Sequence, residues 1–178
     1  MRCNKDRSLK QLQRIWRALR RDEDVFFEIG MDKKANIPAF LLVNLVGLLS
    51  GLGWVLRSES PFLLLASLLA AAPVAWLVFA GCIRFLEMIF EGGGMERNEL
   101  LRLAGFAALP LAFLSVPYVG WLSVVWFWSL MYTAIRSLYS MDPPHALALV
   151  WLGNLVAFVA WGLTMLLVNT VLTSLVGI

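Results

Sequence analysis

The residues of this chain that could carry nucleophilic, acid–base or metal chemistry are few and scattered. His145 is the single histidine and follows two prolines, so a histidine pair cannot bind a metal. Ser115 and Ser123 are possible nucleophiles of a membrane hydrolase, but neither lies in a Gly-x-Ser-x-Gly turn, and both would need His145 as base. Cys3 and Cys82 are far apart and indicate neither a disulfide framework nor a metal site. We therefore predict a protein that is not an enzyme, with no catalytic residue, no metal and no cofactor.

Nucleotide binding and ion-coupled transport are also disfavoured by the pattern. Gly92, Gly93 and Gly94 are not followed by Gly-Lys-Ser or Gly-Lys-Thr, and no strand precedes them, so they do not form a phosphate loop. The long uncharged runs contain no Asp or Glu that could carry protons or bind cations. Asn44 and Asn154 lie inside such runs, where an amide is expected to form a hydrogen bond between helices or, alternatively, to contact a substrate or lipid.

The composition is that of a chain that folds in lipid. Hydrophobic residues make up 60% of its 178 residues, and the mean hydropathy is +0.76. Ten of the fifteen Lys and Arg residues lie between Arg2 and Lys34, so the net charge of +3 hides a basic head and a nearly neutral remainder. The head lacks the pattern of a secretory signal, and we expect no cleavage.

The uncharged runs predict the number of membrane crossings. Runs 35–56 and 60–83 each reach the roughly 20 residues that the hydrocarbon layer requires. Run 103–135 is too long for one crossing, and turn residues at 117–120 predict that it folds back. The last run is expected to form one helix followed by an apolar tail. We predict an all-α, polytopic membrane helix bundle of about five transmembrane helices, at 36–56, 61–83, 100–116, 121–136 and 146–169.

The basic residues predict the orientation of this bundle. Lys and Arg collect in short cytoplasmic loops. If the amino terminus is cytoplasmic, the inner segments hold the basic head together with Arg84, Arg97, Arg102 and Arg136, whereas the outer segments hold only Arg57. We therefore divide the chain into a cytoplasmic basic head, residues 1–34, and a transmembrane domain, residues 35–178.

The head is expected to contain an amphipathic helix. Apolar residues recur at spacings of three and four, and basic residues occupy the other positions. Such a helix suits the headgroup layer of a membrane, and the alternative is a docking helix for a soluble partner. The candidate contact residues are Leu9, Leu12, Arg14, Trp16, Arg17 and Leu19.

Two further patterns concern packing. Gly47 and Gly51 form a small-xxx-small face that lets another helix approach closely, either within the bundle or from a second copy. Arg84, Glu87 and Glu91 share one helix face and are expected to form a solvated, ion-paired helix end.

The segment GGGMERNELLRLAGFAALP, residues 92–110, resembles the core of the Yip-type family, the Ypt/Rab-interacting membrane proteins. The family pattern is a glycine-containing loop followed by a span with Gly-aromatic-Ala and a nearby proline, here Gly105, Phe106, Ala107 and Pro110. The resemblance implies five spans with a cytoplasmic amino terminus. Eukaryotic members carry a longer polar amino-terminal region associated with Rab GTPase binding, so this short head favours a prokaryotic inner membrane over the Golgi or endoplasmic reticulum of a eukaryote.

Together these patterns predict a non-enzymatic membrane scaffold or adaptor of the Yip type. The alternative is a small permease or lipid-handling transporter with a cavity near Asn44 and Asn154. The expected partners are the lipid bilayer, a membrane or cytoplasmic protein, which would be small-GTPase-like only in a eukaryote, and a second copy of the chain. We expect no nucleic-acid partner.

Overall fold

Every regular element in the described part of the chain is a helix. The computed structural model describes residues 13–56, 58, 61–90, 94–116 and 118–176. A short helix at residues 13–19 precedes the others. These are, in order, α2 (Glu23–Met31), η1 (Lys33–Ala35), α3 (Asn36–Val55), α4 (Pro61–Phe90), α5 (Arg97–Ala107), η2 (Leu109–Phe113), α6 (Val119–Tyr139) and α7 (Pro143–Val176).

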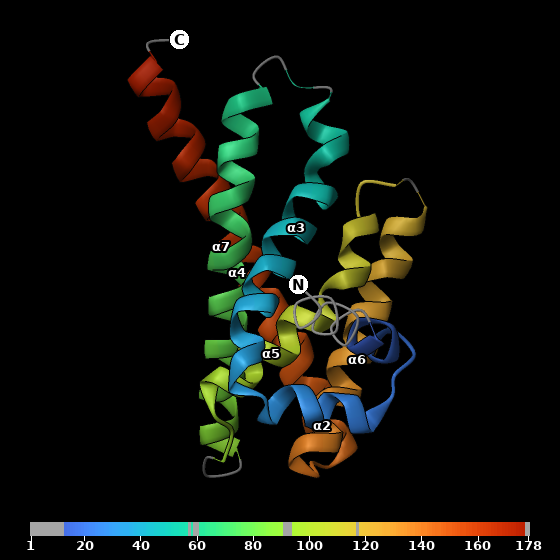
Figure 1. Ribbon diagram of the computed structural model, residues 1–178. Coiled ribbons are helices and arrows are strands. Elements are labelled where there is room, and N and C mark those ends of the chain that lie inside the picture. Colours follow the sequence, from blue (N-terminus) through green and yellow to red (C-terminus); the bar gives the residue numbers. More distant parts are fainter. Residues whose placement is uncertain (1–12, 57, 59–60, 91–93, 117, 177–178) are drawn as a thin grey trace.

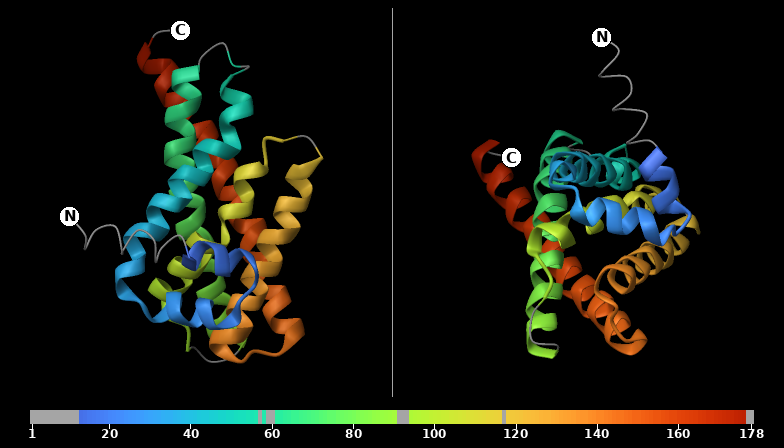
Figure 2. Two further views of the ribbon diagram at one scale, coloured as in Figure 1. Left: turned by 45° about the vertical axis from the view of Figure 1, so that its right-hand side comes forward. Right: turned by 60° about the horizontal axis from the view of Figure 1, so that its bottom comes forward.

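Three helical segments are long and apolar enough to cross a membrane: Lys33–Gly53, Pro61–Phe90 and Pro143–Ser174. α4 packs against both α3 and α7, and the three helices extend further in one direction than the rest of the bundle (Figures 1 and 2). Only 6% of the most apolar window of α7 is buried within the protein. The expectation of an all-helical protein with membrane-type helices is confirmed at this level.

The predicted break in the third uncharged run is present, but the helices around it differ from the prediction. α5 ends at Ala107, where a short 3-10 segment containing Pro110 replaces the α-helix. The missing N–H of proline removes one helical hydrogen bond, which favours this ending. The chain then turns at Tyr118, with φ 66°, and α6 runs back beside η2 (Figure 1). α5 and α6 are not among the three segments of spanning length and hydropathy.

Two helices extend beyond the predicted spans. α4 continues past residue 83 to Phe90, so Arg84 and Glu87 lie on a helix, as their spacing predicted. α7 runs from Pro143 to Val176 without an apolar tail after residue 169, since no proline or glycine cluster interrupts it there.

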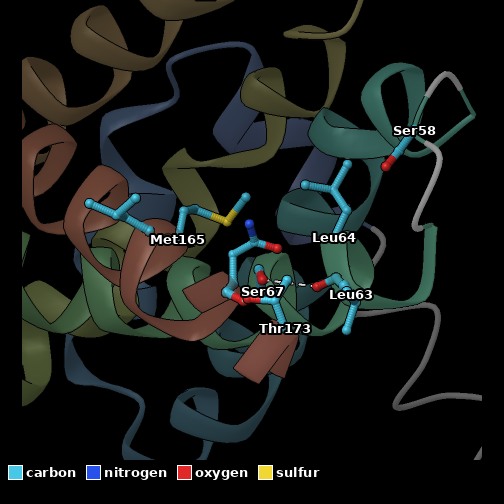
Figure 3. A pocket seen from close by; sticks show the side chains of 8 residues that line it. Ser58, Leu63, Leu64, Ser67, Met165 and Thr173 are labelled. Atoms are coloured by element: carbon cyan, nitrogen blue, oxygen red, sulfur yellow. Dashed lines mark hydrogen bonds between the residues drawn. The ribbon is translucent and has the colours of Figure 1, made fainter. Parts of the chain in front are cut away.

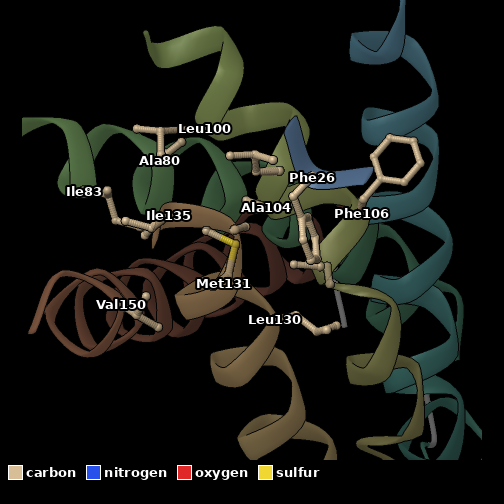
Figure 4. Packing of buried hydrophobic residues seen from close by; sticks show 14 of the residues in the cluster. Phe26, Ala80, Ile83, Leu100, Ala104, Phe106, Leu130, Met131, Ile135 and Val150 are labelled. Carbon is tan, nitrogen blue, oxygen red and sulfur yellow. The ribbon is translucent and has the colours of Figure 1, made fainter. Parts of the chain in front are cut away.

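The core lies where α2 crosses the ends of the longer helices. α2 lies transverse to α4 and α6 in both views (Figures 1 and 2) and packs against α5 and α6. Its Phe26 side chain enters a cluster with Phe106 of α5 and Leu130 and Met131 of α6, all fully buried (Figure 4). The part of the head that precedes the first long helix therefore shares the main core of the bundle.

Candidate membrane-surface site at the basic end of the bundle

The described part of the head is folded onto the bundle. Ala18 from the helix at residues 13–19 and Val25, Phe26 and Ile29 from α2 are completely buried. Asp22 caps α2 by accepting a hydrogen bond from the Asp24 backbone N–H at 3.1 Å, which stabilises the turn between these two helices. Burial of these apolar side chains stabilises the docked head.

Ion pairs join the two helices of the head. The Arg14 guanidinium donates to Glu28 and to Asp32, each at 2.7 Å, and Arg17 donates to Asp22 at 2.7 Å. The hydrogen bond from Arg14 lowers the pKa of Asp32, and the hydrogen bond from Arg17 lowers the pKa of Asp22. Arg14 and Arg17, which the sequence marked as membrane-contact candidates, are thus engaged within the head.

The apolar candidates of the head divide between two surfaces. Leu19 packs against the core beside Ile15, whereas Trp16 is 58% exposed and lies under the Arg20 guanidinium, 4.8 Å from the ring centroid. Leu9 and Leu12 lie outside the described residues. Four basic residues of the head are also exposed: Arg20, Arg21, Lys33 and Lys34. We define Trp16 with these four residues as the head surface.

A buried arginine holds the head from the bundle side. Arg102 of α5 is only 3% exposed, and its guanidinium donates to the Gly30 carbonyl in the last turn of α2 and to Asn36 Oδ1 at 3.2 Å, at the start of α3. A cation at a helix carboxyl end interacts favourably with the helix dipole. Its Nε is buried without a hydrogen-bond partner in the described part of the chain. Arg102 therefore joins three helices at the corner where the head enters the bundle.

Two carboxylates complete this polar layer, of which Glu87 is buried and Glu99 is half-buried. Glu87 of α4 is 5% exposed and accepts a hydrogen bond from the Gly94 backbone N–H at 2.6 Å, while Glu99 of α5 accepts from the Tyr139 hydroxyl at 2.7 Å. The expectation that Glu87 belongs to a solvated helix end is wrong, because α4 places it beneath the α4–α5 connection. Arg84 is exposed as expected, and Glu91 lies outside the described residues.

The sequence did not identify this polar layer. Arg102 was assigned only as one of several basic residues near the membrane, although it lies between apolar residues, Leu101 and Leu103, within a run that becomes fully buried. A charged residue inside an apolar helix was the available signal, because burial of such a group demands partners. Those partners come from α2 and α3 and could not be inferred from spacing along α5.

The two glycines of the small-xxx-small face pack within the bundle. A Cβ added to Gly47 would lie 2.5 Å from Ala72 Cβ, and one added to Gly51 would overlap the Leu68 side chain, so both face α4. The close approach of α3 and α4 therefore uses this face inside the chain.

The side-chain amides of Asn44 and Asn154 donate within their own helices and not, as had been expected, to another helix. Asn44 donates to the Phe40 carbonyl at 2.9 Å, and Asn154 donates to the Val150 carbonyl at 3.0 Å, each within its own helix. Neither residue lines the groove between α4 and α7 or the one beside Phe90 and His145.

The family-like motif lies in the centre of the packing. Gly105, Phe106, Ala107 and Pro110 are all buried. A Cβ on Gly105 would lie 2.6 Å from the Cβ and 2.9 Å from the Cα of Ala39, so α5 and α3 approach through their backbones. The Trp76 indole N–H donates to the Leu101 carbonyl at 2.9 Å and attaches α4 to the same helix.

The candidate nucleophiles have structural hydrogen bonds. Ser115 Oγ donates to the Leu49 carbonyl at 3.3 Å, and the buried Ser123 Oγ donates to the Gly120 carbonyl at 2.6 Å. His145 is exposed at the start of α7. Among the residues that the structure describes, no group of three or more His, Cys, Asp or Glu side chains is placed to hold a metal ion.

The fold and this site define the class of protein only broadly. It is an all-helical bundle with three segments suited to a membrane and a folded, partly basic head at one end. The chain matches no protein-family model, no curated protein and no solved structure. The resemblance to Yip-type proteins therefore stays a prediction.

Proposed function

We propose that this chain is a non-enzymatic integral membrane scaffold or adaptor of the Yip type, which holds a partner protein or organises lipid at the cytoplasmic face of a prokaryotic inner membrane. The observation that carries the proposal is the docking of the head. Because the head is fixed by buried apolar side chains and by Arg102, it presents the head surface in a constant position relative to the bundle.

The arrangement of charge supports the proposed orientation. The head, the end of α4, the start of α5 and the end of α6 lie at the same end of the bundle (Figure 1). The exposed residues Arg84, Arg97 and Arg136 belong to these helix ends. This basic end is the cytoplasmic one in our proposal, since Lys and Arg are enriched on that side.

We further propose that the α5–η2–α6 hairpin crosses the membrane, giving five spans. α6 has 21 residues, which at 1.5 Å per residue span about 30 Å. The tip of the hairpin carries Tyr118 and Trp121, both strongly exposed, and aromatic residues of this kind favour the membrane–water interface.

Cysteine accessibility tests this topology. In a background with Cys3→Ser and Cys82→Ser, we expect Tyr118→Cys to react with an impermeant maleimide added outside, and Glu96→Cys and Ser140→Cys to react only after the membrane is opened. The reason is that the hairpin places residue 118 across the bilayer from residues 96 and 140. Reaction of all three from one side would contradict the third and fourth crossings.

Affinity capture from intact membranes tests the scaffold function. Reversal of the four basic charges of the head surface, in the variant R20E/R21E/K33E/K34E, is expected to reduce co-purified partner at least about tenfold, because each charge contributes attraction to an acidic surface. The control R84E/R136E changes exposed arginines at the same end but outside the head, and it should retain the partner.

Other results would contradict the scaffold function or support the alternative. A set of co-purified proteins identical to that of an unrelated membrane protein would contradict the scaffold, as would saturable solute uptake into proteoliposomes that contain only this chain. Uptake abolished by Asn44→Leu or Asn154→Leu would instead support the alternative of a small permease.

A further inference from the structure

A groove of about 610 Å³ lies between the first turns of α4 and the last turns of α7, at the end of the bundle opposite the head (Figure 3). Apolar side chains of both helices form its walls, and hydroxyl and amide groups lie among them. The lining residues are Ser58, Leu63, Leu64, Ser67, Met165, Leu166, Asn169 and Thr173.

The polar groups of the groove suit a neutral ligand with a hydrogen-bond acceptor. The hydroxyl hydrogens of Ser67 and Thr173 are donated to carbonyls of their own helices, at 2.9 Å to Leu63 and 2.9 Å to Asn169, and Ser67 is fully buried, so neither hydroxyl supplies a donor to a ligand. Asn169 is exposed and contributes an amide that can donate to an ester carbonyl. None of the described lining residues is charged, so the groove offers no counterion to an anionic group.

Its depth places the groove at the level of lipid esters in the proposed membrane arrangement. Ser67 lies about 25 Å along α4 from Arg84, the charged residue at the cytoplasmic end of the apolar part of this helix. The hydrocarbon layer is about 30 Å thick, so Ser67 lies close to its outer boundary. The ester groups of lipids lie at this boundary, between hydrocarbon and headgroup.

The size of the groove is also that of a site for a small ligand. Its volume falls within the range of about 300–1,000 Å³ that is usual for small-molecule sites. An acyl chain with its ester is of a size that this space can hold.

We propose that this groove binds the acylglycerol part of a membrane lipid, with the acyl chain between Leu63, Leu64 and Leu166 and an ester carbonyl accepting a hydrogen bond from the Asn169 amide. This inference goes beyond a scaffold function and rests on the proposed transmembrane arrangement.

Photolabelling in a defined bilayer tests the site. The full chain is reconstituted in phosphatidylcholine vesicles that contain phosphatidylcholine with a diazirine next to the acyl ester, and adducts are mapped by mass spectrometry. We expect adducts to concentrate on residues 61–67 and 165–173. Asn169→Leu removes the amide with little change in size and should reduce this labelling about fivefold, as expected for loss of one hydrogen bond.

Asn154→Leu is the matched control, because it makes the same change on the same helix outside the groove, and it should leave the labelling unchanged. Adducts spread evenly over the exposed faces, or equal labelling of Asn169→Leu and wild type, would overturn the site. Crosslinks between two chains through residues 165–173 would overturn it in favour of a second copy. Resistance to carbonate extraction is measured on each sample, so loss of insertion, which contradicts the proposed function, is distinguished from loss of lipid selectivity.

Discussion

Replacing Gly105 with alanine is expected to destabilise the bundle by about 2–3 kcal/mol, because an added methyl group overpacks a full interface. The new Cβ would lie 2.6 Å from Ala39 Cβ, 2.9 Å from Ala39 Cα and 3.0 Å from its carbonyl oxygen. Two of these atoms are backbone atoms and cannot move aside without shifting α3 away from α5. The measurement is the free energy of unfolding in mixed micelles with an increasing fraction of SDS.

Two variants show whether the loss comes from this contact. Gly81→Ala is the matched control, since a Cβ at Gly81 meets no atom within 4 Å, and removal of a helical glycine there should stabilise the protein by about 0.5–1 kcal/mol. Ala39→Gly combined with Gly105→Ala removes the Cβ–Cβ overlap and should recover part of the stability. A loss in Gly105→Ala no larger than the change in Gly81→Ala would show that α3 and α5 do not approach as described.

Replacing Arg102 with methionine is expected to cost about 2–3 kcal/mol and to loosen the head before the long helices unfold. The guanidinium hydrogen bonds to the Gly30 carbonyl and to Asn36 Oδ1 would be lost, leaving these acceptors without this donor at the corner between α2 and α3. Methionine retains much of the apolar stem, so the loss reports mainly on the polar contacts. The expected readout is faster proteolysis within residues 20–35, measured in micelles together with the free energy of unfolding.

Other variants separate the geometry of Arg102 from its charge. Arg102→Lys keeps the charge but has no planar fork to reach two acceptors on different helices, so we expect it to recover only part of the protection. Arg97→Met removes an exposed arginine from the same helix. It should change the free energy of unfolding by no more than about 0.5 kcal/mol and leave the rate of proteolysis unchanged. If Arg102→Met were as stable and as resistant to protease as the wild type, Arg102 would not hold the head.

The two predictions concern neighbouring parts of one helix. α5 has only 11 residues, yet it contacts α2 and the membrane-length helices α3 and α4. Gly105 sets the distance between α5 and α3, whereas Arg102 fixes the corner through which the chain passes from the head into α3. The segment that resembles the Yip-type core is thus a packing and anchoring element of this bundle.

The sequence by itself determined the helical class and the long apolar segments. Run length and hydropathy are local properties, and the lipid solvent leaves the helix as the way to satisfy the backbone of such runs. The break within run 103–135 was also readable, because proline and a turn sequence act on the chain locally. Helix ends were less predictable, as α4 and α7 show, since apolar side chains do not indicate where a helix stops.

Only the tertiary structure decided how the head and the polar residues are used. Sequence spacing placed Arg14 and Arg17 on the surface of an amphipathic helix, but the carboxylates of Glu28 and Asp32 arrive through the fold of α2. Sequence spacing likewise could not show whether Gly47 packs within the bundle or against a second copy. In the structure it packs against Ala72 of the same chain. Burial and pairing depend on atoms brought together from distant parts of the chain, whereas periodicity reports only on neighbours along it.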